Sequence, residues 1–300
     1  MRIATTQYQA TMGRSLELNQ TMVSRLTEQM ATGNKITVPS DDPITNVRIS
    51  RLNREEAIVS QYRENIGAVK IRLAKNETYL TGMVNDLGAV HDQMVWAADG
   101  SNTPDDLHAM VGSLEALRDS ILYSANTRDQ EGKYIFSGTE TTKQPIVLAA
   151  DGVSYAYAGN TKEQKVVVGN GITQAVNVDV SGIEALLTNL NKTIEALRTT
   201  TTRSSDEPLK SMISGTMDTI QAGQDALAGK IAKFGGAQTV LGTLDSNHAN
   251  VSLSNNTARH DLSALDYGVA STELAGYNMA LQASYQSYSK ISNLSLFNVL

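Results

Sequence analysis

The chain has 300 residues, enough for one large domain or two to three smaller ones, and a formal net charge of −6. It contains no cysteine, which excludes disulfide scaffolds, thiolate metal sites and cysteine nucleophiles. Ser, Thr, Asn and Gln together number 91, against 15 aromatic residues, and this composition favours long helices with distributed contacts over a compact apolar core.

The first predicted helix carries apolar residues at three- and four-residue steps and ends at Gly33–Asn34, a pair typical of helix ends. Asn19 occupies one position of this seam. The apolar members are Met12, Leu16, Val23, Leu26 and Met30.

Two further predicted helices each begin with a polar N-cap residue followed by proline. In the first, Asp42 is a candidate N-cap and Pro43 the first helical residue, and the apolar pattern continues to about Ala98. In the second, Thr103 is the candidate cap before Pro104, and the helix should extend to about Asn126. The acidic pairs at these starts are therefore explained by capping and by complementation of the helix dipole rather than by catalysis.

Between Lys133 and Val180 apolar residues alternate with polar ones, a spacing of two that is typical of strands. This spacing predicts a small antiparallel β unit. Asp151–Gly152 and Asn170–Gly171 are suited to tight hairpin turns within it.

Helical spacing returns after Gly182. Asp206 and Glu207 open a long helix, which we expect to weaken at Phe234–Gly236 and to resume as far as Val251. A last seam, again at three- and four-residue steps, extends from Tyr267 to Ile291.

These elements predict a mainly α fold: a long antiparallel helical rod built from both chain ends, with a small inserted antiparallel β domain. We expect a terminal coiled-coil assembly domain (1–42 and 268–300), a helical rod domain (43–136 and 183–267) and a β domain (137–182).

The sequence lacks the common catalytic, nucleotide-binding and metal-binding motifs. The sequence has no HExxH, GxSxG, Walker A or GxGxxG pattern, and its four histidines have no metal-ligand spacing, so we expect no enzyme, cofactor or metal. Residues 1–75 carry a net charge of +4, too diffuse for nucleic acid. We therefore expect no nucleic-acid partner. No stretch is apolar enough for a signal peptide or a membrane span, so we expect no membrane partner either.

The last helix is unusual because Lys290 is the only charged residue between Gly276 and Leu300. A helix whose polar side carries Asn, Gln, Ser and Ala suits a position surrounded by other helices, where buried charge would be costly. We therefore expect an assembly subunit whose terminal helices supply the interface. The predicted interface residues are Ile3, Met12, Leu16, Val23, Leu26, Met30, Leu274, Tyr277, Leu281, Tyr288, Ile291, Leu294, Leu296, Phe297 and Leu300.

Five blocks, in order, resemble the flagellin-like family of bacterial axial proteins. They are MRIATTQY (1–8), QMATGNKITVPSDDP (29–43), QYRENI (61–66), NTRDQEGKYIFSGTETTKQPI (126–146) and ALQASYQSYSKISNLSLFNVL (280–300).

The resemblance implies a structural subunit that joins the hook to the filament as a ring of copies. Its implied partners are further copies of itself, the first hook-associated protein, flagellin, and an export chaperone on the C-terminal helix. It also implies an extracellular place in the flagellum, reached by type III export without a cleavable signal. The alternatives are filament flagellin itself or a secreted coiled-coil protein of the needle-tip or adhesin type.

Overall fold

A computed structural model describes the backbone of residues 2–297 and the side chains of residues 7–290. The chain divides into two compact units. A terminal unit contains Met1–Ile58 and Asn250–Leu300, and a central unit contains Val59–Ala249. The helices are α1 (Arg2–Thr32), α2 (Pro43–Ala97), α3 (Pro104–Ala125), α4 (Ile183–Thr199), α5 (Leu209–Ser263) and α6 (Tyr267–Phe297). The strands are β1 (Ile146–Leu148), β2 (Tyr155–Tyr157), β3 (Lys165–Gly169) and β4 (Ile172–Ala175).

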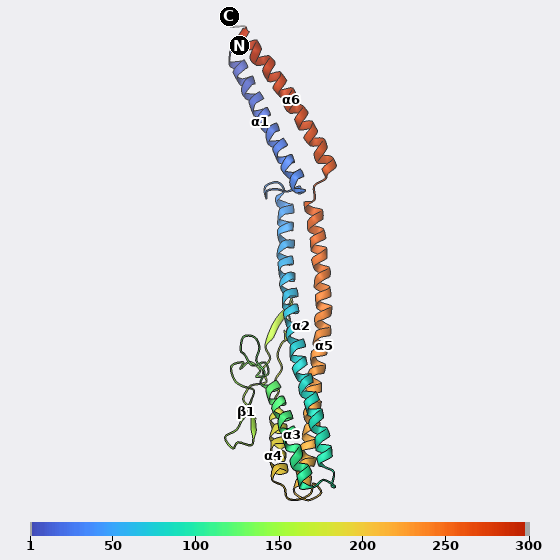
Figure 1. The fold of residues 1–300 in the computed structure, drawn as a ribbon. Helices are drawn as coiled ribbons and strands as arrows, with labels where there is room; N and C mark the ends of the chain where they lie inside the picture. The colour runs from blue at the N-terminus through green and yellow to red at the C-terminus, as the bar shows by residue number, and fades with distance from the viewer. Residues whose placement is uncertain (1, 298–300) are drawn as a thin grey trace. The chain divides into compact units, whose positions relative to one another are not determined.

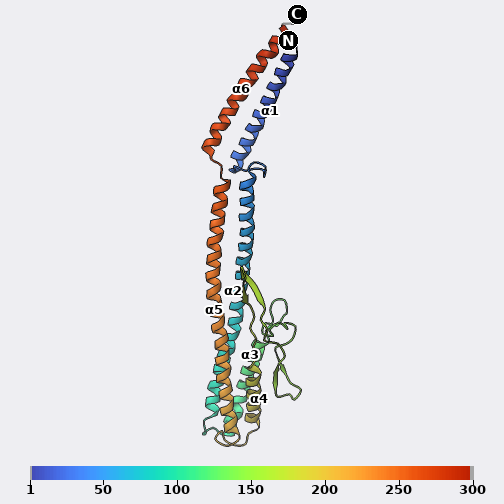
Figure 2. The same ribbon diagram turned by 180° about the vertical axis from the view of Figure 1, so that it is seen from behind.

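The central unit holds the main hydrophobic core. Parts of α2 and α5 lie beside α3 and α4, and one cluster of buried apolar side chains joins all four helices (Figures 1 and 2). Leu80 of α2, Leu114 of α3 and Leu190 of α4 are fully buried in this cluster. Leu227 of α5 completes it at 1 % exposure.

The predicted helix starts are confirmed. Asp42 accepts a hydrogen bond from the Thr45 amide at 3.0 Å and caps α2. Thr103 and Asp106 form a reciprocal capping box at the start of α3. The Thr103 hydroxyl and amide, in that order, lower the pKa of Asp106.

The β region is smaller than expected. It forms two separate antiparallel pairs, β1–β2 and β3–β4, in place of one unit from Lys133 to Val180. Their turns lie at the predicted positions, with positive φ at Gly152 (71°) and Gly171 (70°). The alternating segment after Ala175 is not a strand, because the Asn177 side chain takes the place of a strand partner by bonding the Gln164 amide and the Lys162 carbonyl.

The expected weak point at Phe234–Gly236 is wrong. Helix α5 continues without a break from Leu209 to Ser263, and Phe234 is 4 % exposed. Burial of this aromatic ring in the core outweighs the low helix propensity of the two glycines that follow it. The predicted fold class, mainly α with a small antiparallel β insertion, is confirmed.

Candidate assembly interface

The terminal helices α1 and α6 pack against each other within the terminal unit, side by side in both views (Figures 1 and 2). Leu26 (7 % exposed) and Ala270 (2 %) are buried apolar residues of this pair. The other predicted seam residues that turn inward are half-buried: Met12, Leu16, Val23, Met30, Leu274, Tyr277 and Leu281.

Some predicted interface residues are not brought into this seam. Tyr288 is 42 % exposed. The half-buried positions of α6 continue through Ser284 and Ser287, so Tyr288 lies beside the seam. Ile3, Ile291, Leu294, Leu296, Phe297 and Leu300 lie outside the residues whose side chains the structure describes.

The pair also exposes large apolar side chains. Leu18 is 61 % exposed on α1, and Met279 (66 %) and Tyr285 (55 %) are exposed on α6. Exposed apolar patches mark interaction sites, so these side chains make the pair a candidate interface. The sequence predicted an interaction surface on the last helix because Lys290 is its only charged residue after Gly276, and it did not single out Leu18.

The first connector (33–42) links α1 to α2, and the second (264–266) links α5 to α6. Hydrogen bonds join the two connectors to each other and to the end of α5, and we call this region the joint. The Lys35 amide donates to the Ser263 carbonyl at 2.8 Å, and the Leu265 amide donates to the Gly33 carbonyl at 3.0 Å. Gly33 has φ 71°, and an added Cβ would lie 3.2 Å from the Tyr267 hydroxyl oxygen. A glycine is therefore required where the first helix turns into the connector.

Asp41 holds the first connector in place. Its carboxylate accepts hydrogen bonds from the amides of Thr37 (3.0 Å) and Val38 (3.2 Å) and pairs with Arg25 at 3.0 Å. Desolvation alone raises the pKa of Asp41, but the Val38 and Thr37 amides and the Arg25 charge outweigh it and place the pKa below the ordinary 3.8. The sequence predicted Asp42 as the cap and explained the Asp41–Asp42 pair by capping and helix-dipole complementation; in the structure Asp42 caps α2 and Asp41 holds the connector.

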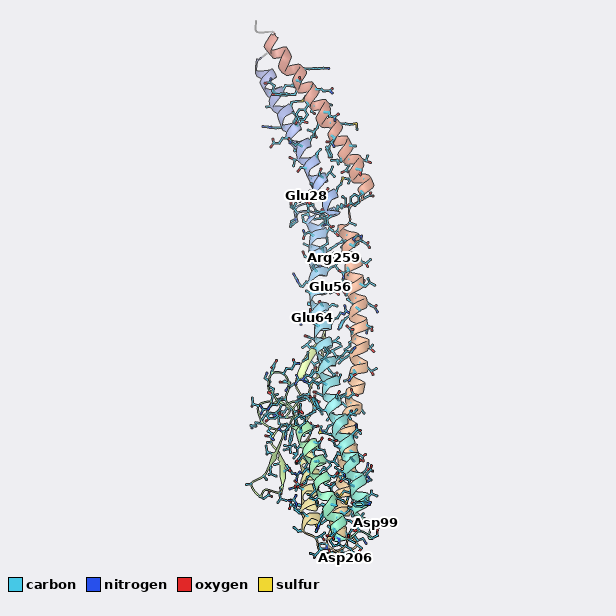
Figure 3. The ribbon with its side chains drawn as sticks, viewed as in Figure 1. Glu28, Glu56, Glu64, Asp99, Asp206 and Arg259 are labelled. Carbon is cyan, nitrogen blue, oxygen red and sulfur yellow. The ribbon has the colours of Figure 1, made fainter. Side chains whose placement is uncertain are left out.

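A polar seam lies between α2 and α5 within the terminal unit. Ser252 donates to one carboxylate oxygen of Glu56 at 2.5 Å, and Arg259 donates to the Asn53 side chain at 3.2 Å. Glu56 and Arg259 are labelled on these two helices in Figure 3. Among the described residues, the second Glu56 oxygen and the Asn255 amide nitrogen have no hydrogen-bond partner. Such polar positions favour one register of a helix pair.

A groove of about 720 Å³ lies at the joint. Apolar side chains, including Leu26, Leu265 and Val269, form part of its lining. Its charged lining consists of five carboxylates, Asp41, Asp42, Asp261, Asp266 and Glu273, and two basic side chains, Arg25 and Lys35. Since Arg25 is paired with Asp41, the groove is acidic.

The described side chains offer no metal centre, because no three His, Asp or Glu residues come together among them. His248, one of the four histidines, is bonded through Nε2 to the Val168 carbonyl at 2.9 Å and stacks near Tyr62. Within residues 2–297, no helix combines the length and the hydropathy that a membrane crossing requires.

The comparisons with known proteins find similarity to proteins of the bacterial flagellum. Residues 3–141 match the bacterial flagellin N-terminal helical region. Over 92 % of its length the chain is 26 % identical to flagellar hook-associated protein 3 of Salmonella typhimurium, of which it also covers 92 %. The resemblance predicted from the five sequence blocks is thus confirmed.

Solved structures show the same fold. A flagellar hook-associated protein of Vibrio parahaemolyticus superposes with a TM-score of 0.69 and 26 % identity, over 75 % of this chain and 100 % of that one. The flagellar junction protein of Legionella pneumophila superposes with a TM-score of 0.56 and 14 % identity, over 65 % of this chain and 99 % of that one. These relatives are structural proteins of the flagellum.

Proposed function

We propose that this chain is a structural subunit of the bacterial flagellum that joins the hook to the flagellin filament. The observation that carries the proposal is similarity to hook-associated protein 3 over nearly the whole chain, at matched length. The terminal helix pair supports it physically, because it exposes large apolar side chains and its C-terminal helix has one charge after Gly276. The proposed activity is assembly rather than catalysis.

The assembly is a ring of copies, with the first hook-associated protein on one side and flagellin on the other. The terminal domain of residues 1–42 and 268–300 supplies its contacts, while the rod domain (43–136 and 183–267) and the β domain (137–182) complete the subunit. An export chaperone covers the C-terminal helix in the cytoplasm, since exposed apolar surface there would otherwise promote self-association. The subunit leaves by type III export without a cleavable signal.

Electron microscopy of a strain that lacks the gene tests this function. We expect hooks without filaments and monomeric flagellin in the medium, and full recovery when the intact chain is supplied. Normal filaments on the deletion strain would overturn the proposal.

A truncation separates assembly from folding. Removing residues 292–300 should leave a soluble helical protein that is exported but does not restore filaments. The helical content is checked by circular dichroism, and a chain with Lys192→Glu, an exposed position in the central unit, serves as the control that restores them. Restoration by the truncated chain would show that the C-terminal residues are not part of the interface.

A further inference from the structure

The first turns of α2 carry a second seam that the fold of the terminal unit does not use. Thr45, Ile49, Leu52 and Glu56 are the half-buried positions on the packed side. On the opposite side, exposed residues follow one another at three- and four-residue steps, which places them on one helix face. These residues are Ile44, Val47, Arg51, Arg54 and Ile58, and we call them the outer α2 seam.

The outer α2 seam is both apolar and basic. Ile44 is 70 % exposed, Val47 52 % and Ile58 46 %. Arg51 and Arg54 form no ion pair within the described part of the chain. Three large exposed apolar residues in one row are typical of a surface that another molecule covers.

The groove at the joint is the complement of this seam within the same chain. It combines apolar lining residues with five carboxylates, and Asp261 and Glu273 are exposed without an ion-pair partner among the described residues. The helix face is apolar and basic, and the groove is apolar and acidic. The two surfaces are therefore complementary in charge and alike in hydropathy. Because identical copies present both surfaces, each copy can give its seam to one neighbour and its groove to another.

We propose that the outer α2 seam of one copy docks into the acidic joint groove of a second copy. This inference rests on the proposed function, since it names a contact of the assembled subunit, and it brings the start of α2 into that contact. The contact uses two different surfaces, so it is heterologous and generates a closed ring or a helix of copies. Arg51 and Arg54 face Asp261 and Glu273 across it.

Single cysteines test which surfaces meet, because the natural chain has none. Val47→Cys places a thiol on the seam, and Val269→Cys places one at the groove. In flagella from a deletion strain that expresses both variants, mild oxidation should give a covalent dimer on non-reducing gels. Either variant alone should give none, because a heterologous contact never brings two copies of the same residue together.

Charge reversal tests the complementarity. In the cysteine assay, Arg51→Glu with Arg54→Glu on the seam chain should cut the dimer by about tenfold, which corresponds to roughly 1.4 kcal/mol. Adding Asp261→Lys with Glu273→Lys on the groove chain should restore it. Lys192→Glu with Lys210→Glu changes the net charge of the seam chain equally at exposed central positions and should leave the dimer unchanged.

The outcomes separate this contact from the proposed function. If the intact chain restores filaments but Val47→Cys links to itself, or to a different protein, the seam has another occupant and the inference is wrong. A reversal that leaves the dimer unchanged, or that its partner reversal does not rescue, also overturns it. If the deletion strain makes normal filaments, the proposed function itself fails.

Discussion

Two carboxylates tie loops to helices in this protein. Asp41 joins the first connector to Arg25 of α1, and Asp179 joins the end of the β region to Lys230 of α5 at 3.0 Å. Desolvation raises the pKa of Asp179, but the Ser181 hydroxyl and the Lys230 ammonium outweigh it, so that the pKa lies below the ordinary 3.8. The charged form of each carboxylate is therefore the form that the fold stabilises.

The central unit should lose stability in acid partly through Asp179. A lowered folded-state pKa means that the contribution is complete above about pH 4, the unfolded value, and is lost as the pH falls through the folded value. Asp179→Asn should lower the free energy of unfolding at pH 7 by about 1–3 kcal/mol and flatten its dependence between about pH 5 and 3. Urea denaturation across this range measures both effects.

Asp119→Asn is the matched control, because that carboxylate is 62 % exposed beside Arg118. It should change neither the stability nor its pH dependence appreciably. An Asp179→Asn chain with the same acid profile as the natural one would contradict the assignment.

At the scale of elements, helix ends could be predicted from the sequence because their chemistry is local. Gly33, Asp42 and Thr103 each act within a few residues of the position where the chain must stop or start a helix. The extent of the β strands and the continuity of α5 could not be predicted in this way. They depend on Asn177 replacing a strand and on Phe234 reaching the core, which are contacts between distant segments.

The same distinction between local and long-range features applies to the candidate interface. Spacing predicted the inward residues of α1 and α6, since a seam is a periodic feature. The joint involves residues more than two hundred positions apart, such as Tyr267 donating to the Met30 carbonyl at 3.1 Å. Periodicity carries no information about such a pair.

The capping box of α3 gives a prediction at this scale. Thr103→Ala removes the acceptor for the Asp106 amide and the donor to its carboxylate, and should lower the free energy of unfolding of the central unit by about 1 kcal/mol. Thr103→Ser keeps both groups and should lower the free energy of unfolding by only about 0.3 kcal/mol. Chemical denaturation read from Trp96, the single tryptophan, measures both. Equal losses in the two variants would show that the methyl group, and not the hydroxyl, matters.

At the scale of the whole molecule, burial is divided unequally between the units. Most fully buried side chains belong to the central unit, while Leu26, Gln29, Asn255 and Ala270 are the few buried side chains described in the terminal unit. Segments with little buried apolar surface open more readily.

Amide hydrogen exchange at low protein concentration should therefore be fast in α1 and α6 and slow in α3 and α4. On assembly, the same terminal amides should become protected, because neighbouring copies cover them. Similar slow exchange in both units of the free chain would contradict this expectation.

The pairing of α1 with α6 also favours an order of folding in which the central unit forms first. The first helix to emerge finds its partner only in the last, and closing so long a loop in an unfolded chain carries the largest entropy cost. Once α2 to α5 have packed, residues 59 and 249 are already held in one folded body, and the loop that remains to be closed is short. The inserted unit therefore acts as an internal template for the chain ends, and damage to its core should delay the ends as well.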